Sequence, residues 1–194
     1  MSGAASRSGI DRERLTIAPL DEKALGEFTN FSCDDVDLDD FIRADATRLQ
    51  SLKVALTYVA WYEGKPRGYA ALMADAVVLK PNERRKIRDT LGQSLAFADH
   101  PVVPALKVAR IAVDRSFRER YRGVGEALVR FAFLTGLDFS DLCGCRLLTL
   151  DAYPESMGFY EGLGFVRNLD KTYAERNHPS MRLDLFAPVP PTWL

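Results

Sequence analysis

The stretch from Val108 to Ala127 constrains the fold of this chain more than any other. It opens with an apolar run, Val108 to Val113, that only Arg110 interrupts. A segment with four arginines follows, and Gly123-Val124-Gly125 then leads into a helical pattern. Backbone N–H groups at a glycine-rich helix start attract anions, and arginine side chains add fork-shaped phosphate donors. The stretch therefore predicts a strand, a basic loop and a helix that together bind a phosphorylated ligand.

Two common phosphate loops do not fit this segment. A Walker loop needs Gly-x-x-x-x-Gly-Lys-Ser/Thr, and a dinucleotide fingerprint needs a third glycine where Leu128 stands. Arg120-Tyr-Arg-Gly123-Val-Gly125 instead resembles the Gln/Arg-x-x-Gly-x-Gly/Ala signature of the GCN5-related N-acetyltransferases, whose loop wraps the pyrophosphate of coenzyme A. By itself, the segment also fits a glycine turn before a surface helix with solvent-facing arginines.

A second motif lies downstream of the first. Arg146 to Leu150 is a compact strand candidate, and Pro154 precedes a short helical stretch with Phe159-Tyr160 and then Gly164-Phe165. This order resembles the C-terminal half of the same family. With two motifs in the family's order, the chain is identified as a member over residues 54 to 184.

The resemblance implies an α/β fold: a mixed, largely antiparallel sheet flanked by helices on both faces, with central strands that splay apart. It implies acetyl-CoA as the co-substrate, with the pantetheine arm on a strand and the pyrophosphate on the loop. The implied cofactor contacts are Ile111, Ala112, Val113, Arg118, Arg120, Tyr121, Arg122, Gly123, Val124, Gly125 and Glu126. No metal is expected.

The resemblance also implies direct attack of an amine on the thioester, with backbone N–H groups polarising the oxyanion. Tyr160 stands where the family has the acid that protonates the departing thiolate, and a phenol pKa near 10 suits a donor at neutral pH. Without the resemblance, Tyr160 fits better as a packed aromatic beside Phe159 and Phe165.

The general base is not evident from the sequence. His100 and His178 each sit beside proline in an expected loop, while Glu63, Asp99 and Asp151 remain unplaced candidates. An α-amine, with a pKa near 8, needs less help to lose its proton than a lysine amine, with a pKa of about 10.4. This favours an α-amine acceptor or a water-mediated deprotonation.

Three further segments resemble one branch of the family, the toxins that acetylate aminoacyl-tRNA. They are Phe31-x-Cys33 before Leu38-x-x-Phe41-Ile42, Gly68-Tyr-Ala-Ala-Leu, and Ala109-Arg-Ile-Ala-Val-Asp114. The formal net charge of −1 gives no general attraction to RNA, so tRNA would depend on local patches at residues 84–88 and 115–122.

The primary expectation is therefore acetyl transfer from acetyl-CoA to a primary amine. The tRNA-acetylating toxin is the alternative, and an inactive coenzyme-A-fold module for binding or dimerisation is the alternative of another class. The sequence leaves open the acceptor amine, the acyl-chain preference, homodimerisation and the existence of an antitoxin partner.

At 194 residues, the chain predicts a flexible leader over residues 1–11, a single domain over 12–186 and a proline-rich tail over 187–194. Three cysteines without a secretory signal favour reduced thiols in a cytoplasmic protein. Cys143 and Cys145 are expected as buried thiols rather than zinc ligands. No apolar run is long enough to span a membrane.

Five aspartates, Asp34, Asp35, Asp37, Asp39 and Asp40, crowd the start of a helix predicted from Leu38 onward. They fit a solvated helix start favoured by the dipole, or a site that receives a cationic amine. The other expected elements are a strand at 15–17, a hairpin of 54–62 and 69–79, a helix within 80–100, and a last strand at 180–185. The helix expected over 124–139 is apolar nearly all round and should be buried against a sheet. Gly68 is expected at a bulge or an exposed edge.

Overall fold

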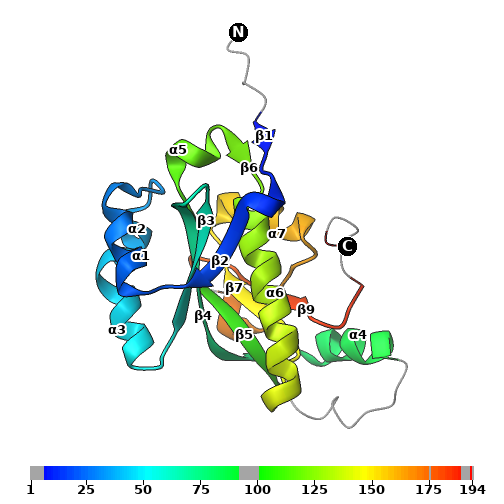
Figure 1. Ribbon diagram of the computed structural model, residues 1–194. Coiled ribbons are helices and arrows are strands. Elements are labelled where there is room, and N and C mark those ends of the chain that lie inside the picture. Colours follow the sequence, from blue (N-terminus) through cyan, green and yellow to red (C-terminus); the bar gives the residue numbers. More distant parts are fainter. Residues whose placement is uncertain (1–6, 92–100, 175, 189–192, 194) are drawn as a thin grey trace. The chain divides into compact units, whose positions relative to one another are not determined.

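The computed structural model describes residues 7–91, 101–174, 176–188 and 193 (Figure 1). The chain divides into two compact units. Unit 1 comprises Met1–Met73 and Ala109–Phe131, and unit 2 comprises Ala74–Val108 and Ala132–Leu194. The expectation of a single domain over residues 12–186 stays a prediction. The main sheet has seven strands in the order β2-β3-β4-β5-β7-β9-β8, which confirms the mixed α/β fold class.

The strands of unit 1 form an antiparallel meander. It consists of β2 (Leu15–Pro19), β3 (Leu56–Tyr62) and the first part of β4 (Lys65–Val78). Glu63 and Gly64 form the tight turn of the predicted hairpin, and both have positive φ, of 54° and 72°. This is the backbone that a two-residue turn between twisted strands requires. The hairpin prediction is therefore confirmed.

The register of this hairpin shifts next to Gly68, because Ala60 pairs with Gly68 while Trp61 pairs with Pro66. Arg67 is the extra residue of the resulting bulge. Gly68 itself is buried, so the alternative of an exposed edge is wrong. A Cβ at Gly68 would lie 2.7 Å from the carbonyl oxygen of Ala112. The glycine thus permits a close approach of two backbones.

Helices cover both faces of these strands within unit 1. On one face, Tyr69 packs against the rings of Phe28, Phe31 and Phe41, with centroid distances of 5.8 to 6.3 Å. Its hydroxyl donates to the carbonyl of Leu38 at 2.7 Å, and burial raises the pKa of Tyr69. Neighbouring strand residues point to opposite faces, so Gly68 faces the first turns of the helix that begins at Val124.

The first of these faces is covered by a series of short helices. They are α1 (Glu22–Gly26), the 3-10 turn Glu27–Asn30, α2 (Val36–Asp40), a π-helical turn at Phe41–Asp45, and α3 (Ala46–Ser51). The helix expected from Leu38 onward is thus three consecutive pieces. Asp35 caps α2 by accepting from the N–H of Leu38 at 3.2 Å. Asp39 is only 8% exposed, so the expectation of a solvated acid cluster is wrong for this residue.

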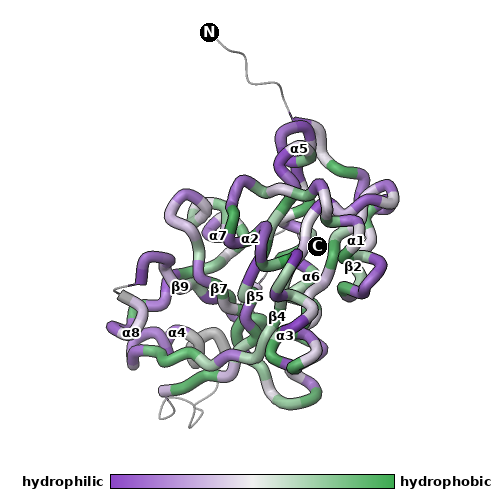
Figure 2. The backbone as a smooth tube through the Cα atoms, turned by 90° about the vertical axis from the view of Figure 1, so that its left-hand side faces the viewer, coloured by the Kyte–Doolittle hydropathy of each residue, from purple (hydrophilic) through white to green (hydrophobic). Residues whose placement is uncertain are grey.

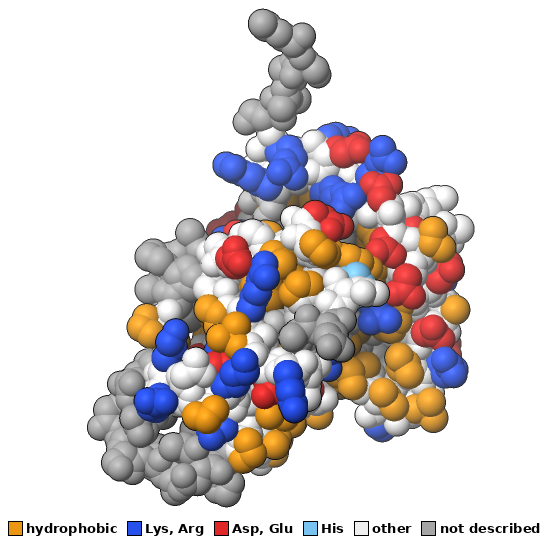
Figure 3. Space-filling view, turned by 180° about the vertical axis from the view of Figure 1, so that it is seen from behind, with side chains coloured by type: hydrophobic (Ala, Val, Ile, Leu, Met, Phe, Trp, Pro, Cys, Tyr) orange, Lys and Arg blue, Asp and Glu red, His pale blue; other side chains and the backbone are white. Residues whose placement is uncertain are grey.

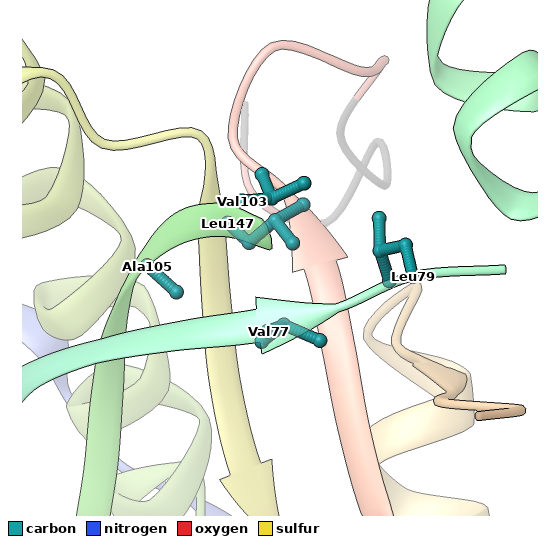
Figure 4. Close-up of a cluster of buried hydrophobic side chains, with 5 residues drawn as sticks. All are labelled: Val77, Leu79, Val103, Ala105 and Leu147. Carbon is teal, nitrogen blue, oxygen red and sulfur yellow. The ribbon is translucent and has the colours of Figure 1, made fainter. Parts of the chain in front are cut away.

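Unit 2 is built on a parallel pair of strands. The first part of β5 (Val102–Val113) runs parallel to β7 (Leu147–Asp151), and β9 (Ser180–Asp184) and β8 (Val166–Arg167) follow antiparallel. One cluster of buried side chains fills the end of this sheet (Figure 4). Its members are Val77, Leu79, Val103, Ala105 and Leu147.

A buried ion pair fastens α4 (Pro81–Leu91) to the sheet of unit 2. Glu83 is 2% exposed, and its Oε1 lies 2.6 Å from Nη1 of Arg182 on β9. The same Nη1 donates to Oδ1 of Asn168 at 2.9 Å and to the carbonyl of Arg167 at 2.8 Å. A buried charge pair is tolerable only with such additional hydrogen bonds.

The helix α6 (Val124–Cys143) begins in unit 1 and ends in unit 2. It extends beyond the predicted residues 124–139. Leu128, Val129 and Ala132 are buried, as expected for a helix packed against a sheet, whereas Leu134 is 48% exposed, so the burial does not extend all round the helix. Phe133 lies 5.0 Å from the ring of Trp193, which places one residue of the predicted tail in the core. Cys145 is buried as expected, whereas Cys143 is exposed.

Two further observations concern the described ranges as a whole. No helix in them combines the length and the apolar character needed to cross a bilayer. No group of three or more His, Cys, Asp or Glu side chains among those residues is arranged to hold a metal ion.

Candidate active site

The segment predicted to bind the cofactor begins where β5 ends. Asp114 follows β5 directly and caps the short helix α5 (Arg115–Arg118), accepting from the N–H of Phe117 at 2.9 Å and from Oγ of Ser116 at 2.6 Å. The N–H of Asp114 in turn donates to the carbonyl of Arg67, the bulge residue of β4, at 2.9 Å. The bulge therefore helps to fix where the loop leaves the sheet.

Aromatic stacking holds the middle of the loop. The ring of Phe117 stacks on Tyr121 at a centroid distance of 4.6 Å and lies 5.3 Å from the ring of Tyr62. The guanidinium of Arg67 lies 4.9 Å above the same Phe117 ring. Tyr121 and Arg122 form the short strand β6. The predicted basic loop is thus a folded turn with its own small core.

Gly123 makes the transition from β6 to α6. Its φ of 118° lies in the region that residues with a side chain rarely adopt, and α6 begins at the next residue, Val124. Val124 is buried, while Gly125 and Glu126 are half-buried. The carbonyl of Gly123 accepts from the N–H of Ala127 at 2.9 Å, as expected for the first turn of a helix.

The N-terminal segment lies on this loop. The strand β1 (Ser8–Gly9), inside the stretch predicted as a flexible leader, pairs in parallel with β6. The N–H groups of Ser8 and Ile10 donate to the carbonyls of Arg120 and Arg122, each at 3.0 Å. Arg12 forms an ion pair with Glu126 at 2.9 Å. The segment from Ser8 to Arg12 therefore packs against the loop and against the first turn of α6.

Two exposed arginines of the loop, Arg115 and Arg118, form ion pairs. Arg115 bonds to Glu119 and to Asp34, each at 2.9 Å, and these two carboxylates raise the pKa of Arg115. Arg118 bonds to the other oxygen of Asp34 at 2.9 Å. Figure 2 shows this part of the chain as strongly hydrophilic around α5, and Figure 3 shows Lys and Arg side chains with interspersed acids at the same upper end.

The residues predicted to pair with pantetheine lie at the end of β5. The hydrogen-bonded ladder between β5 and β7 runs from Ala105 and Leu147 to Val108 and Leu150, whereas β5 continues to Val113. Ala112 is buried against Gly68, while Ile111 and Val113 are half-buried. All the predicted cofactor contacts belong to unit 1.

Tyr160, the predicted acid, belongs to α7 (Met157–Gly162) of unit 2. It is 7% exposed and makes edge-to-face contacts with Phe159 and Phe165, at centroid distances of 5.0 and 5.8 Å. Burial raises the pKa of Tyr160 to about 12. The phenol therefore keeps its proton across the physiological range and can act as a donor.

The candidates for a general base have other partners. Asp151 lies 2.6 Å from Nζ of Lys107 and 3.3 Å from Nη1 of Arg176, so two cations engage it. Glu63 forms an ion pair with Arg14, and the ring of His178 packs edge-to-face on Tyr153 at 4.5 Å. Asp99 and His100 lie outside the described residues.

Exposed cations also gather around α4 and α8 (Lys171–Ala174) in unit 2 (Figure 3, lower left). We call this the α4–α8 basic surface: Lys80, Arg85, Lys86, Lys171 and Arg176. It contains part of the basic run that the sequence marks as a candidate RNA contact.

Two acids of this region were not assigned a specific role by the sequence. Asp114 could have been recognised, because an aspartate between a strand and Arg-Ser-Phe fits a helix cap. The partners of Asp34 could not have been recognised from the sequence, because Arg115 and Arg118 lie more than 80 residues away from it along the chain.

Comparison with known proteins finds a curated relative and several similar solved structures. No family model matches the chain. The tRNA-acetylating toxin of Mycobacterium tuberculosis (strain ATCC 25618 / H37Rv) is 28% identical over 149 residues, which cover 76% of this chain and 83% of the toxin.

Among solved structures, a tyrosine-to-phenylalanine mutant of KacT has a TM-score of 0.72 at 20% identity, over 89% of this chain and 95% of KacT. AtaT in complex with acetyl-methionyl-tRNAfMet has a TM-score of 0.69 at 21% identity, over 88% and 94% of the two chains. A mutant AtaT toxin bound to acetyl-CoA and to the C-terminus of the antitoxin AtaR has a TM-score of 0.67 at 21% identity, over 89% and 94%. The chain shares its fold with these proteins.

Proposed function

We propose that the chain is a GCN5-related N-acetyltransferase and that it transfers the acetyl group of acetyl-CoA to the α-amine of an aminoacyl-tRNA. The proposal draws on its 28% identity to a tRNA-acetylating toxin and on the fold that it shares with KacT and AtaT. The observation that carries the proposal is the turn at Gly123. Its positive φ directs the chain from β6 into the 20-residue helix α6, directly after a loop with four arginines.

The loop has the chemistry that coenzyme A needs. The N–H groups at the start of α6 have no acceptor within the helix, and together with the helix dipole they favour an anion. Arg118, Arg120 and Arg122 are exposed and add positive charge beside this point. We assign the pyrophosphate to the turn from Arg120 to Glu126 and the pantetheine amides to the backbone of Ile111, Ala112 and Val113.

The proposed reaction needs one proton donor. The amine nitrogen attacks the thioester carbonyl carbon, the C–S bond breaks, and the electron pair leaves on sulfur. Tyr160 then gives its phenolic proton to the thiolate, the proton lost by the amine passes to solvent, and the Tyr160 phenolate takes up a proton from solvent before the next cycle. A phenol with a pKa of about 12 remains protonated until the thiolate forms.

Three observations support aminoacyl-tRNA as the acceptor. The Mycobacterium tuberculosis relative is a tRNA-acetylating toxin, and the AtaT complex contains acetyl-methionyl-tRNA. The α4–α8 basic surface supplies exposed cations that can pair with backbone phosphates although the net charge of the chain is −1. An α-amine acceptor also needs less help from a base, and Asp151 is already engaged by Lys107 and Arg176.

The test is thiol release from acetyl-CoA with two acceptor pools measured side by side. One pool is total charged tRNA, and the other is a panel of small amines and peptides. We expect turnover with charged tRNA only. Turnover with small amines or peptides alone would contradict the tRNA assignment while retaining the acetyltransferase, and binding of acetyl-CoA without turnover in either pool would favour a non-catalytic binding module.

The contribution of the α4–α8 basic surface is tested with the double variant Arg85→Ala/Lys86→Ala. Each lost phosphate contact lowers the slope of log affinity against log salt by about 0.9 for a duplex, so KM for charged tRNA should rise and become less salt-dependent. KM for acetyl-CoA should not change. The matched control is Lys23→Ala, which removes a lysine from α1 in unit 1.

A further inference from the structure

One carboxylate joins the two arginines of α5. Oδ1 of Asp34 lies 2.9 Å from Nη1 of Arg115, and Oδ2 lies 2.9 Å from Nη2 of Arg118. The two arginines are three residues apart on a single helical turn, where like charges face and repel each other. The carboxylate between them offsets this repulsion and holds the two guanidinium groups side by side.

The position of Asp34 is built into the fold of unit 1. Its φ of 69° is in the left-handed region, which costs free energy for any residue with a side chain. The preceding two residues are fastened to buried Asp39, because Oγ of Ser32 donates to Oδ2 at 2.7 Å and the N–H of Cys33 donates to Oδ1 at 2.9 Å.

The same turn is also tied to α5 by its backbone. The carbonyl of Ser32 accepts from the N–H of Arg115 at 2.7 Å. The backbone strain at Asp34 is thus held in place from both sides, by Asp39 and by α5. Residues that the surrounding structure holds in a strained backbone conformation are concentrated at functional sites.

The arrangement leaves donors for a further anion. A guanidinium group has five N–H donors. In the contacts among the described residues, Arg115 uses Nη1 for Asp34 and Nε for Glu119, and Arg118 uses Nη2 for Asp34. The two side chains remain 58% and 46% exposed. Asp34 therefore orients the two guanidinium groups and leaves some of their N–H donors available for another anion.

We propose that Asp34 is a positioning residue that sets Arg115 and Arg118 as a pair to receive the 3′-phosphate of coenzyme A. The inference rests on the proposed acetyl-CoA function. In that function the turn at Gly123 takes the pyrophosphate through backbone N–H groups, so the remaining strongly charged group of coenzyme A is the 3′-phosphate. Two paired guanidinium groups on α5, the helix that precedes this turn in the chain, match the charge and the several oxygens of such a phosphate monoester.

The test compares the binding of coenzyme A and 3′-dephospho-coenzyme A by calorimetry, for the full chain and for Asp34→Asn. Asparagine adopts the left-handed region as readily as aspartate, so this change removes the charge and leaves the backbone in place. We expect the unsubstituted chain to prefer coenzyme A by about tenfold or more, the gain of a charge-assisted hydrogen-bonded pair. In Asp34→Asn the preference should fall to about twofold.

The control is Asp37→Asn, which removes a neighbouring acid that is 71% exposed and contacts Arg110 instead of α5. It should keep the full preference for coenzyme A. An unchanged or larger preference in Asp34→Asn would overturn the inference, because Asp34 would then only compete with the phosphate. Absence of binding of either ligand to the unsubstituted chain would instead overturn the proposed acetyl-CoA function itself.

Discussion

A Cβ placed on Gly123 would lie 2.9 Å from Cγ1 of Ile10. Ile10 therefore occupies the space that the side chain of any other residue at position 123 would need. Together with the φ of 118°, this contact leaves room for glycine alone. Gly123 therefore permits both the turn into α6 and the packing of Ile10, next to β1, against the loop.

Gly123→Ala is expected to weaken the binding of acetyl-CoA by about tenfold or more, because the strained φ costs about 1–3 kcal/mol and the methyl group displaces Ile10. Calorimetry measures the affinity, and thermal unfolding reports any general loss of stability. Gly26→Ala is the matched control, since a Cβ there meets nothing within 4 Å. Equal affinity in both variants would refute the assignment of the loop.

Tyr160→Phe is expected to lower kcat by about a hundredfold or more while the Kd for acetyl-CoA stays unchanged, since only the proton donor is lost. Steady-state kinetics and calorimetry separate the two effects. Because the pKa of Tyr160 is raised to about 12, its protonation should not limit kcat of the unsubstituted chain below pH 10. Tyr58→Phe removes a phenol that packs on Phe131 and serves as the control. Equal kcat values in the two variants would exclude Tyr160 as the acid.

Glu83→Leu is expected to lower the free energy of unfolding by about 3–5 kcal/mol, because it leaves the charge of Arg182 buried without its partner. Urea denaturation measures the change. The double variant Glu83→Leu/Arg182→Met should recover much of the loss. For comparison, Asp45→Ala breaks an exposed pair with Arg48 and should cost less than about 1 kcal/mol. A small effect of Glu83→Leu would mean that the buried pair does not hold α4.

Asp39 should make stability fall in acid. Burial opposes its ionisation, but the hydrogen bonds from Ser32 and Cys33 and the charge of Arg43 outweigh this, so the pKa of Asp39 is lowered in the folded state. A carboxyl group with a lowered folded pKa stabilises the fold above its unfolded pKa, and this contribution is lost as pH falls through the folded value.

Asp39→Asn is therefore expected to be less stable than the unsubstituted chain by about 2 kcal/mol at pH 7, the scale of hydrogen bonds to a charged group. The difference should shrink steadily below pH 4, where the unsubstituted chain loses the same contribution. Denaturation in urea at pH 7, 5 and 3 measures it. A difference that is constant with pH would show that Asp39 acts through packing instead of its charge.

The sequence was most informative where local chemistry decides the structure. The turn at Glu63-Gly64, the helix start after Gly123 and the strand before Pro154 each follow from glycine, proline or apolar spacing within a few residues. The two family motifs then connected these elements into one topology, which the seven-stranded sheet confirms.

The sequence was least informative where distant segments meet. The pairing of β1 with β6 joins residues more than 100 positions apart, and two-residue strands leave no periodic pattern. The partners of Asp34 and the burial of Asp39 likewise depend on tertiary contacts. The exposure of Leu134 has the same cause, because an apolar residue in a predicted helix does not show by itself whether another element covers it.

The pairing of β1 with β6 also bears on how the protein should be handled. A purification tag added before Met1 would lie only seven residues ahead of a strand that hydrogen-bonds to Arg120 and Arg122. The affinity for coenzyme A measured on a tagged protein would therefore include any effect of the tag on the loop. Proteins that are compared for coenzyme A binding should therefore carry the same residues before Ser8, and a cleaved sample is the proper reference.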